Sequence, residues 1–379
     1  MLYLDHAATS FPKPPMVAER MSEYITNVGA SINRSVYAPA QEAALVTLRL
    51  RERIARLLGY SGRPNHVILT SGCTMGLNMV IQGWLQPGDH CIVSSMEHNA
   101  VMRPLSAVGV EFDRIPCDSE GFFQPDDIRP LIKENTKLVI VAHGSNVTGS
   151  VQDAAAVGRI CKEFSIPFLL DAAQTAGHIP VSFDDFGCST MAVPAHKGLL
   201  GPSGIGALIL SAEFAKKLPP LIVGGTGSAS HTEVQPNFLP DKFESGTPNL
   251  PGIYGWEAAL EFLENRTVDA IRSHDIAIMQ QFLSGIAEID CVRLVGTADT
   301  SRRVGVFALD FQEQDNALVG DRLEKEFGIL TRCGLHCAPN AHRTVGTYPQ
   351  GVVRISTGWT TTEDDIDQAL RAVRSIALG

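Results

Sequence analysis

Short apolar runs alternate with helix-like patterns between residues 48 and 210. Five of these runs have the length and composition of buried strands: 66–70, 91–94, 137–143, 167–171 and 206–210. Strands that are apolar on both faces are typical of a parallel sheet, because the helices of its βαβ units cover both faces. The pattern therefore predicts an α/β domain with a large, mostly parallel sheet. Ligands of such sheets bind beyond the carboxyl ends of the strands, so the residues that follow each run are the first candidates for a site.

The rest of the chain predicts a second, smaller unit. A passage rich in Gly, Ser and Pro over residues 224–251 interrupts the alternation and is too long for an ordinary connection. Four elements are expected after it: helices over 256–265 and 272–286, a strand over 304–309, and a helix that begins after Thr362. We expect a large domain over residues 15–255, and a small α+β domain made of residues 1–14 and 256–379.

Composition narrows the possible partners. The 379 residues include 31 Lys and Arg against 41 Asp and Glu, a formal net charge of -10, which disfavours nucleic-acid binding. The densest basic stretch, residues 49–56, has leucines at helical spacing and is interpreted as a solvated helix face. No apolar run approaches the ~20 residues of a membrane span, and the first residues lack the pattern of a signal peptide. We therefore expect a cytoplasmic protein, in which the eight cysteines do not form a disulfide scaffold.

Two charged residues near strand-like runs suggest cofactor chemistry. Asp171 ends the run 167–171, and Gln174 follows three residues later. A buried carboxylate needs a cationic or donor partner, and a protonated pyridine nitrogen would serve. The alternative is that Asp171 caps the next helix. Lys197 lies in glycine-rich sequence, and Schiff-base formation is the usual covalent role of a partly buried lysine, although a lone lysine is usually a surface residue.

Other segments could bind a phosphate or a planar ring. Residues 71–74 place hydroxyl and N–H groups at the start of a helical pattern, which suits a phosphate but also ordinary capping. A second candidate, residues 244–247, lies in the glycine-rich passage. His98 follows a strand-like run and could stack on a planar ligand or shuttle protons, or it could be a core histidine.

Cysteine and histidine residues gather near the C-terminal end. Cys337, beside His336 and Arg332, could be a thiolate nucleophile. Together with Cys333 and His342 these residues could instead bind zinc, but a single C-x3-C element without a distant partner makes this the weaker hypothesis. Arg354 lies in a strand-like context and could hold a carboxylate with both guanidinium nitrogens, or it could form a surface ion pair.

In their order along the chain, these motifs resemble the cysteine desulfurases of the class V aminotransferase superfamily, which are pyridoxal 5'-phosphate (PLP) enzymes of fold type I. The resemblance covers essentially the whole chain. It is carried by residues 3–9, 71–74, 97–98, 145–146, 171–174, 196–197, 201–204, 244–247, 336–338 and 353–356. The ordered set Asp-x-x-Gln, His-Lys and His-Cys-Ala is its most specific part.

The resemblance implies a role for each matching residue. At the cofactor ring, the implied roles are a Schiff base for Lys197, pairing with the pyridine nitrogen for Asp171, a hydrogen bond to the phenolic oxygen for Gln174, and stacking for His98. The implied phosphate contacts are Thr74, the Cys73 N–H, His196, and Thr247 from the second subunit of a homodimer. The implied holders of the substrate carboxylate are Asn146 and Arg354.

The implied reaction converts L-cysteine to L-alanine and leaves a persulfide on Cys337, which a sulfur-acceptor protein or a reductant would discharge. His336 or the charge of the cofactor would assist the thiol, and Cys333 is expected to be a bystander. A selenocysteine lyase or a cystine or cysteine C–S lyase of the same superfamily is the nearest alternative. A zinc-binding or non-catalytic scaffold is an alternative from another class.

Two positions depart from the pattern of the family. Pro194 stands where many relatives place a serine that donates to the phosphate, a contact that residues 225–227 could replace. Met75 follows Thr74 where an acidic residue is common. Both departures concern the affinity for the cofactor more than the type of reaction.

Overall fold

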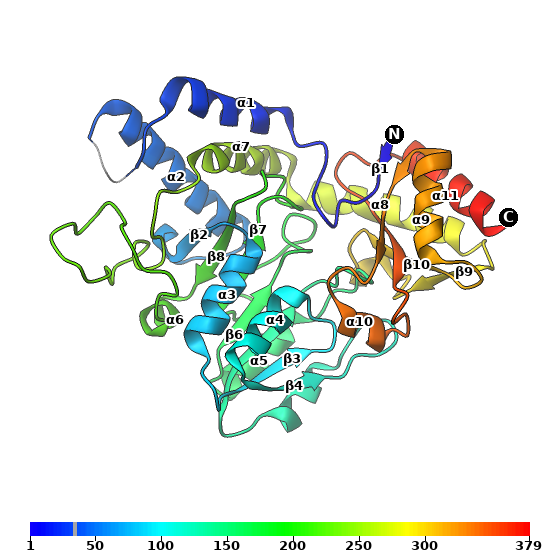
Figure 1. Ribbon diagram of the computed structural model, residues 1–379, viewed down its shortest axis with the longest axis horizontal. Helices are drawn as coiled ribbons and strands as arrows, with labels where there is room; N and C mark the ends of the chain where they lie inside the picture. The colour runs from blue at the N-terminus through cyan, green and yellow to red at the C-terminus, as the bar shows by residue number, and fades with distance from the viewer. Residues whose placement is uncertain (33–35) are drawn as a thin grey trace.

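The structure is a computed structural model that describes residues 1–32 and 36–379 (Figure 1). Its central sheet has seven strands in the order β2-β8-β7-β6-β5-β3-β4. Their bounds are β2 Val67–Thr70, β3 His90–Ser94, β4 Glu111–Ile115, β5 Thr136–Ala142, β6 Phe168–Asp171, β7 Thr190–Pro194 and β8 Gly206–Leu210. Strand β8 runs antiparallel to both of its neighbours, β2 and β7, and the other neighbouring pairs of this sheet are parallel. The predicted mostly parallel sheet is therefore confirmed.

Helices cover both faces of this sheet. Their bounds are α1 Pro15–Glu23, α2 Ala38–Leu57, α3 Cys73–Trp84, α4 Asn99–Val108, α5 Ala154–Glu163, α6 Ala212–Lys217 and α7 Leu250–Arg266. Successive strand residues point to opposite faces. Phe168 and Leu170 pack in one apolar cluster with α2, α5 and α7, whereas Leu169 packs in another with α3, α4 and α6. This explains why the strands read as continuous apolar runs.

A second, smaller sheet lies beside the first, with both chain termini near it (Figure 1). Its antiparallel strands are β9 Val292–Val295, β10 Val306–Phe311, β12 Arg332–Gly334 and β13 Val352–Ser356, in the order β12-β13-β10-β9. The accompanying helices are α8 Val268–Ile286, α9 Asn316–Phe327, α10 Pro339–Thr344 and α11 Glu363–Ala377. The expected last helix does begin after Thr362, which forms a capping box with Asp365.

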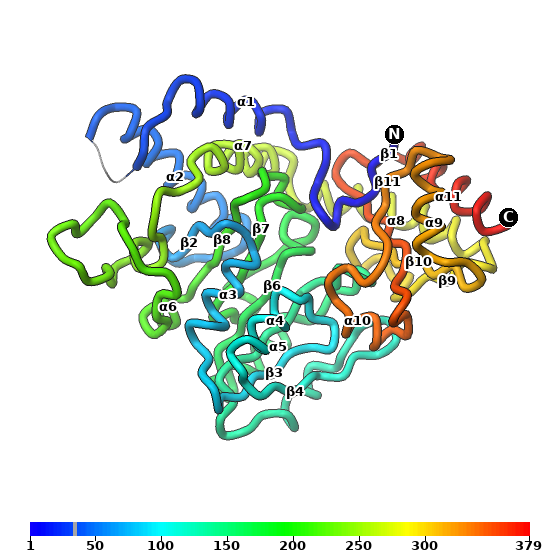
Figure 2. Tube along the Cα trace, in the orientation of Figure 1, coloured from blue at the N-terminus to red at the C-terminus, as the bar shows by residue number. Residues whose placement is uncertain are grey.

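The N-terminal segment joins this smaller part, as the tube in Figure 2 makes plain. Strand β1 (Leu2–Tyr3) pairs in parallel with β11 (Ile329–Leu330). Short segments of 3-10 or π-helix occur at Tyr24–Val28, Pro64–His66, Pro125–Leu131 and Thr300–Arg302. Helix α7 continues across residues 255 and 256. The boundary between the large and the small domain that was expected at this point stays a prediction.

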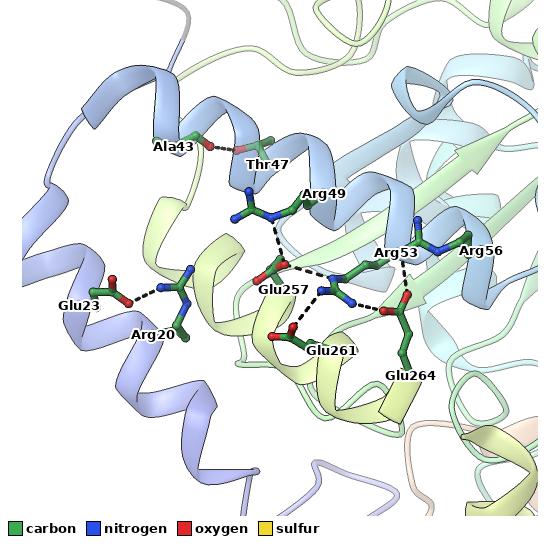
Figure 3. A network of polar contacts seen from close by, with 10 residues as sticks. All are labelled: Arg20, Glu23, Ala43, Thr47, Arg49, Arg53, Arg56, Glu257, Glu261 and Glu264. Atoms are coloured by element: carbon green, nitrogen blue, oxygen red, sulfur yellow. Dashed lines mark hydrogen bonds and ion pairs between the residues drawn. The ribbon is translucent and has the colours of Figure 1, made fainter. Parts of the chain in front are cut away.

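The interpretation of residues 49–56 as a solvated helix face holds for Arg49 and Arg56, which are exposed, and is wrong for Arg51 and Arg53, which are largely buried. Helix α2 packs along α7, whose glutamates at 257, 261 and 264 follow one helical face toward it. Figure 3 shows Arg53 pairing with all three glutamates, while Arg49 and Arg56 join at the ends. Arg51 is buried, and its two terminal nitrogens donate to the two carboxylate oxygens of Glu244 at 2.7 and 2.6 Å.

Arg51→Met is expected to lower the free energy of unfolding by about 3–5 kcal/mol, because it leaves the largely buried Glu244 carboxylate without its cation. Arg49→Met is the matched control. Its guanidinium is 45% exposed and Glu257 keeps Arg53, so its cost should stay under about 1 kcal/mol. Urea unfolding followed by circular dichroism measures both changes. Equal losses in the two variants would contradict the assignment.

Candidate active site

A cavity of about 540 Å³ opens at the carboxyl ends of β2, β3, β5, β6 and β7. This is the edge of the sheet at which a ligand was expected. The candidate residues that line the cavity are Cys73, Thr74, His98, Asn146, Asp171, Gln174, His196 and Lys197. The remaining three candidates, Thr247, Cys337 and Arg354, lie outside its lining.

Lys197 lies on the turn that follows β7. Hydrogen bonds close the turn from Leu200 N–H to the Lys197 carbonyl at 2.9 Å and from Gly201 N–H to the Ala195 carbonyl at 2.8 Å. Gly198 packs so tightly that a Cβ atom there would lie 2.4 Å from the Ala176 carbonyl oxygen. Burial lowers the pKa of Lys197 from its ordinary value, while the Asp171 carboxylate acts in the opposite direction. An amine shifted toward its neutral form can act as a nucleophile or as a base.

Asp171 is a buried carboxylate at the end of β6. Its Oδ1 accepts the Ala173 N–H at 2.9 Å and lies 3.5 Å from the Cys73 sulfur. Burial raises the pKa of the Cys73 thiol well above its usual value, so this thiol is protonated and donates. With Oδ1 occupied by these two donors, Oδ2 is the oxygen left to pair with a cationic group in the cavity.

His98 caps helix α4. Its Nδ1 accepts the Ala100 N–H at 3.0 Å, which places the proton of the neutral ring on Nε2. Burial lowers the pKa of His98 to about 4, so the imidazole is neutral at pH 7. A neutral ring held by its own helix can stack on a planar ligand.

The first turn of α3 faces the cavity with open N–H groups. Its N-cap is Gly72, which has no side chain for capping and adopts φ 149°. The N-terminus of a helix attracts anions through these N–H groups and its dipole. His196 lines the same cavity, and its Nδ1 is buried without a partner among the described residues. Pro194 lines the same cavity and adds no N–H donor.

Cys337 is exposed at the edge of the cavity on a loop with unusual backbone geometry. His336 and Cys337 are consecutive non-glycine residues with φ of 50° and 59°, a conformation that costs free energy and concentrates at functional sites. The Asn99 N–H donates to the Cys337 carbonyl at 2.8 Å, and Asn146 Nδ2 donates to the His336 carbonyl at 2.7 Å. The loop is therefore tied to residues beside and within the cavity.

Arg332 places a cation beside the Cys337 sulfur, with Nη2 at 3.6 Å. His336 cannot supply this charge. Burial, reinforced by the Arg354 guanidinium, lowers the pKa of His336 to about 3, and its Nε2 donates to the Arg332 carbonyl at 3.1 Å. His336 and the charge of the cofactor were considered from sequence as groups that could assist the thiol. The structure disfavours His336.

Arg354 is buried in β13 and already has partners. Its Nη2 donates to Asp5 Oδ1 at 2.5 Å, its Nη1 donates to the Asn146 carbonyl at 3.1 Å, and its Nε is buried without a partner among the described residues. The expected pair of Asn146 and Arg354 is therefore in contact. Asp5 occupies one side of the guanidinium, a role for which the sequence held no signal beyond the motif at residues 3–9.

Gln174 and Thr247 complete the set of candidates. Gln174 Nε2 donates to the Ala7 carbonyl at 3.1 Å, so its amide is engaged by the N-terminal segment. Thr247 is exposed in a neighbouring pocket that shares Ser71, Met75, Gly204 and Ile222 with the main cavity. One chain alone does not bring Thr247 into the cavity.

The structure also bears on metals and membranes. Within residues 1–32 and 36–379, no three His, Cys, Asp or Glu side chains are close enough together to hold a metal ion. In the same part of the chain, no helix is both long and apolar enough to cross a membrane.

Comparison with known proteins identifies the family of the chain. Residues 2–369 match the family model described as aminotransferase class-V. A probable cysteine desulfurase of Methanothermobacter thermautotrophicus is 30% identical over 384 residues, which cover 99% of this chain and 94% of the relative. A cysteine desulfurase from Thermococcus onnurineus, solved in its apo form, matches with a TM-score of 0.92 at 27% identity over 100% of this chain and 95% of its own. The Escherichia coli cysteine desulfurase CsdA matches with a TM-score of 0.87 at 28% identity over 99% and 94%. The chain therefore belongs to the aminotransferase class-V family and, within it, to the cysteine desulfurases.

Proposed function

We propose that the protein is a PLP-dependent cysteine desulfurase that converts L-cysteine to L-alanine and carries the sulfur as a persulfide on Cys337. The observation that carries the proposal is the convergence of Lys197, Asp171 and His98 on one cavity, with a thiol at its edge. Membership of a family whose named relatives are cysteine desulfurases supports it.

The residues present fit PLP. The buried Asp171 carboxylate would pair with the protonated pyridine nitrogen, and the neutral ring of His98 would stack on the pyridine. The open first turn of α3, with Cys73 and Thr74, would hold the phosphate together with His196. Lys197 would hold the aldehyde carbon covalently through its amine.

Bound in this way, PLP would accept the electron pair that remains on the substrate Cα when its proton leaves. Lys197 is the base that this step needs, because its pKa is lowered by burial and it lies in the cavity. Arg354 and Asn146 would orient the substrate through its carboxylate. The unpartnered Nε of Arg354 supports this role, since it offers a buried donor without an acceptor.

The sulfur step requires a thiolate. Cys337 would attack the sulfur of the substrate and keep it as a persulfide, while the bond between the substrate Cβ and sulfur would break. The electron pair of that bond would stay on the carbon side, and protons taken up at Cβ and Cα would complete the alanine that leaves. Arg332, at 3.6 Å from the Cys337 sulfur, would pair with the thiolate before the attack. A reductant or an acceptor protein would then remove the sulfur.

We also propose a homodimer with composite sites. Thr247 is exposed beside the cavity in one chain, and Leu221 and Ile222 of the cavity lining also expose apolar surface. A second subunit that covers this surface could bring its own Thr247 to the phosphate site.

The test is the purified protein with L-cysteine and a thiol reductant, after its visible absorption has been recorded before and after borohydride. We expect a band that borohydride abolishes, equal amounts of alanine and sulfide, and a dimer by light scattering. A yellow protein that is inert to L-cysteine would favour the selenocysteine or cystine lyase alternatives. A colourless protein that PLP cannot reconstitute would overturn the enzyme proposal, and a fully active monomer would overturn the composite site.

A further inference from the structure

The carbonyl oxygen of His196, the residue before Lys197, accepts an unusual number of hydrogen bonds. Four donors reach it from the N-terminal segment: Ser10 N–H at 2.9 Å, Thr9 Oγ1 at 3.1 Å, Ser10 Oγ at 3.2 Å and Lys13 Nζ at 2.6 Å. A carbonyl oxygen has two lone pairs, so four donors saturate it. The N-terminal segment thus binds the main chain at the peptide unit that directly precedes Lys197.

This segment, residues 5–13, is hereafter called the strap. It leaves β1 at the smaller sheet and passes between the two parts of the molecule to α1 (Figure 1). Besides His196 it touches two other site residues, because Asp5 pairs with Arg354 and the Ala7 carbonyl accepts from Gln174. Tyr3, which precedes the strap, holds its middle, because the Tyr3 hydroxyl donates to the Thr9 carbonyl at 2.9 Å.

Lys13 is a cation of the strap, and no acid partner for it lies in the described part of the chain. Its ammonium is half-buried and donates to the His196 carbonyl and to Ser10 Oγ at 2.7 Å. No carboxylate lies within 4.0 Å of it in the described part of the chain. Burial lowers the pKa of Lys13 to about 8, because desolvation destabilises the charged ammonium. Its hydrogen bonds to neutral acceptors are what keep it there.

We propose that Lys13 is a positioning residue for Lys197, an inference that rests on the proposed function. The His196 carbonyl and the Lys197 nitrogen belong to one planar peptide unit, so a fixed carbonyl oxygen also fixes the plane from which the Lys197 side chain starts. The turn is also held by the hydrogen bond from Gly201 N–H to the Ala195 carbonyl and by the close packing of Gly198 against Ala176. A long side chain that starts from a rigid base loses less entropy when its amine must reach one atom.

The experiment compares Lys13→Met, which keeps the length of the chain without a donor, with Lys13→Arg, which restores a cationic donor. Lys162→Met, at an exposed lysine of the outer helix α5, is the control. In the holoenzyme, Lys13→Met should lower kcat for L-cysteine about tenfold, as expected for the loss of one charged hydrogen bond, with KM within about twofold because Arg354 is untouched. Lys13→Arg should recover most of kcat, and Lys162→Met should equal the wild type.

A second readout needs no cofactor. In the apoprotein, hydrogen–deuterium exchange at the bonded amides of residues 195–201 should be about tenfold faster in Lys13→Met than in the wild type, in line with the lost hydrogen bond. Ser10→Ala removes one donor to the His196 carbonyl and one acceptor of Lys13. It should shift exchange in the same direction, and it replaces Lys13→Met if that variant does not fold.

The outcomes separate this inference from the proposed function. If borohydride fixes PLP on Lys197 of the wild type but Lys13→Met and Ser10→Ala match it in exchange and kcat, the positioning role is overturned. If Lys13→Arg folds but fails to recover kcat, the loss of the cationic hydrogen bond is not the cause of the lower kcat in Lys13→Met. The inference is then also overturned. If the wild type does not attach PLP at Lys197, the proposed function fails, while faster exchange would still show that the strap holds the turn.

Discussion

Alanine formation from L-cysteine is expected to fall at least about a hundredfold when Cys337 is replaced by alanine or serine, because neither side chain supplies a thiolate nucleophile. The visible absorption of the bound cofactor should persist, since Cys337 lies outside the lining of the cavity. Alanine and sulfide released per minute, measured on protein with a matched cofactor content, give the comparison.

Cys333→Ala is the matched control for this prediction. The Cys333 sulfur packs against Gly320 of α9, where an added Cβ atom would lie 2.1 Å from it. It points into the apolar cluster of the smaller part, and its loss should leave turnover within about twofold of the wild type, as is common for sites away from the chemistry. Cysteine turnover that survives in Cys337→Ala would instead favour a lyase that expels the sulfur without an enzymic nucleophile.

Lys197→Ala is expected to remove both the covalent attachment of PLP and the base for the Cα proton, so turnover should drop by about a thousandfold or more. PLP should still bind through Asp171, His98 and the first turn of α3, although more weakly. After treatment with borohydride, mass spectrometry of proteolytic peptides should find the reduced adduct on Lys197 in the wild type and nowhere in the variant.

Lys162→Met serves again as the control, since it removes an exposed lysine without touching the cavity. An adduct on another lysine in the wild type would move the attachment site, and the proposed base with it. Retained turnover in Lys197→Ala would exclude it as the essential base.

The difference between Cys337 and Cys333 illustrates how far the site could be predicted. Sequence alone put both thiols in one short segment and could separate them only through the family resemblance. In the structure, β12 directs Cys333 toward α9, while two consecutive residues with positive φ turn Cys337 outward beside Arg332. The direction of a side chain at the end of a strand depends on backbone dihedrals that a residue pattern does not encode.

His336 shows the same limit in electrostatics. From sequence it was a candidate to assist the thiol because it is adjacent to Cys337. Burial and the nearby Arg354 lower its pKa to about 3, so its ring is neutral at pH 7, and the cation found beside the Cys337 sulfur is Arg332. The protonation of an imidazole is decided by its desolvation and its neighbours in space.

Residue patterns alone predicted five of the seven strands of the central sheet but missed β4 and β7. They also predicted the start of the last helix at Thr362 and the order of chemical groups that marks the family. These features depend on short-range periodicity, local capping and residue type, all of which are present in the chain before it folds. Only the tertiary structure decided that Arg51 meets Glu244, that Asp5 meets Arg354 and that Lys13 meets the His196 carbonyl. The partners in these pairs are 193, 349 and 183 residues apart, and no local pattern records such a distance, because it is the packing of whole elements that brings the two ends together.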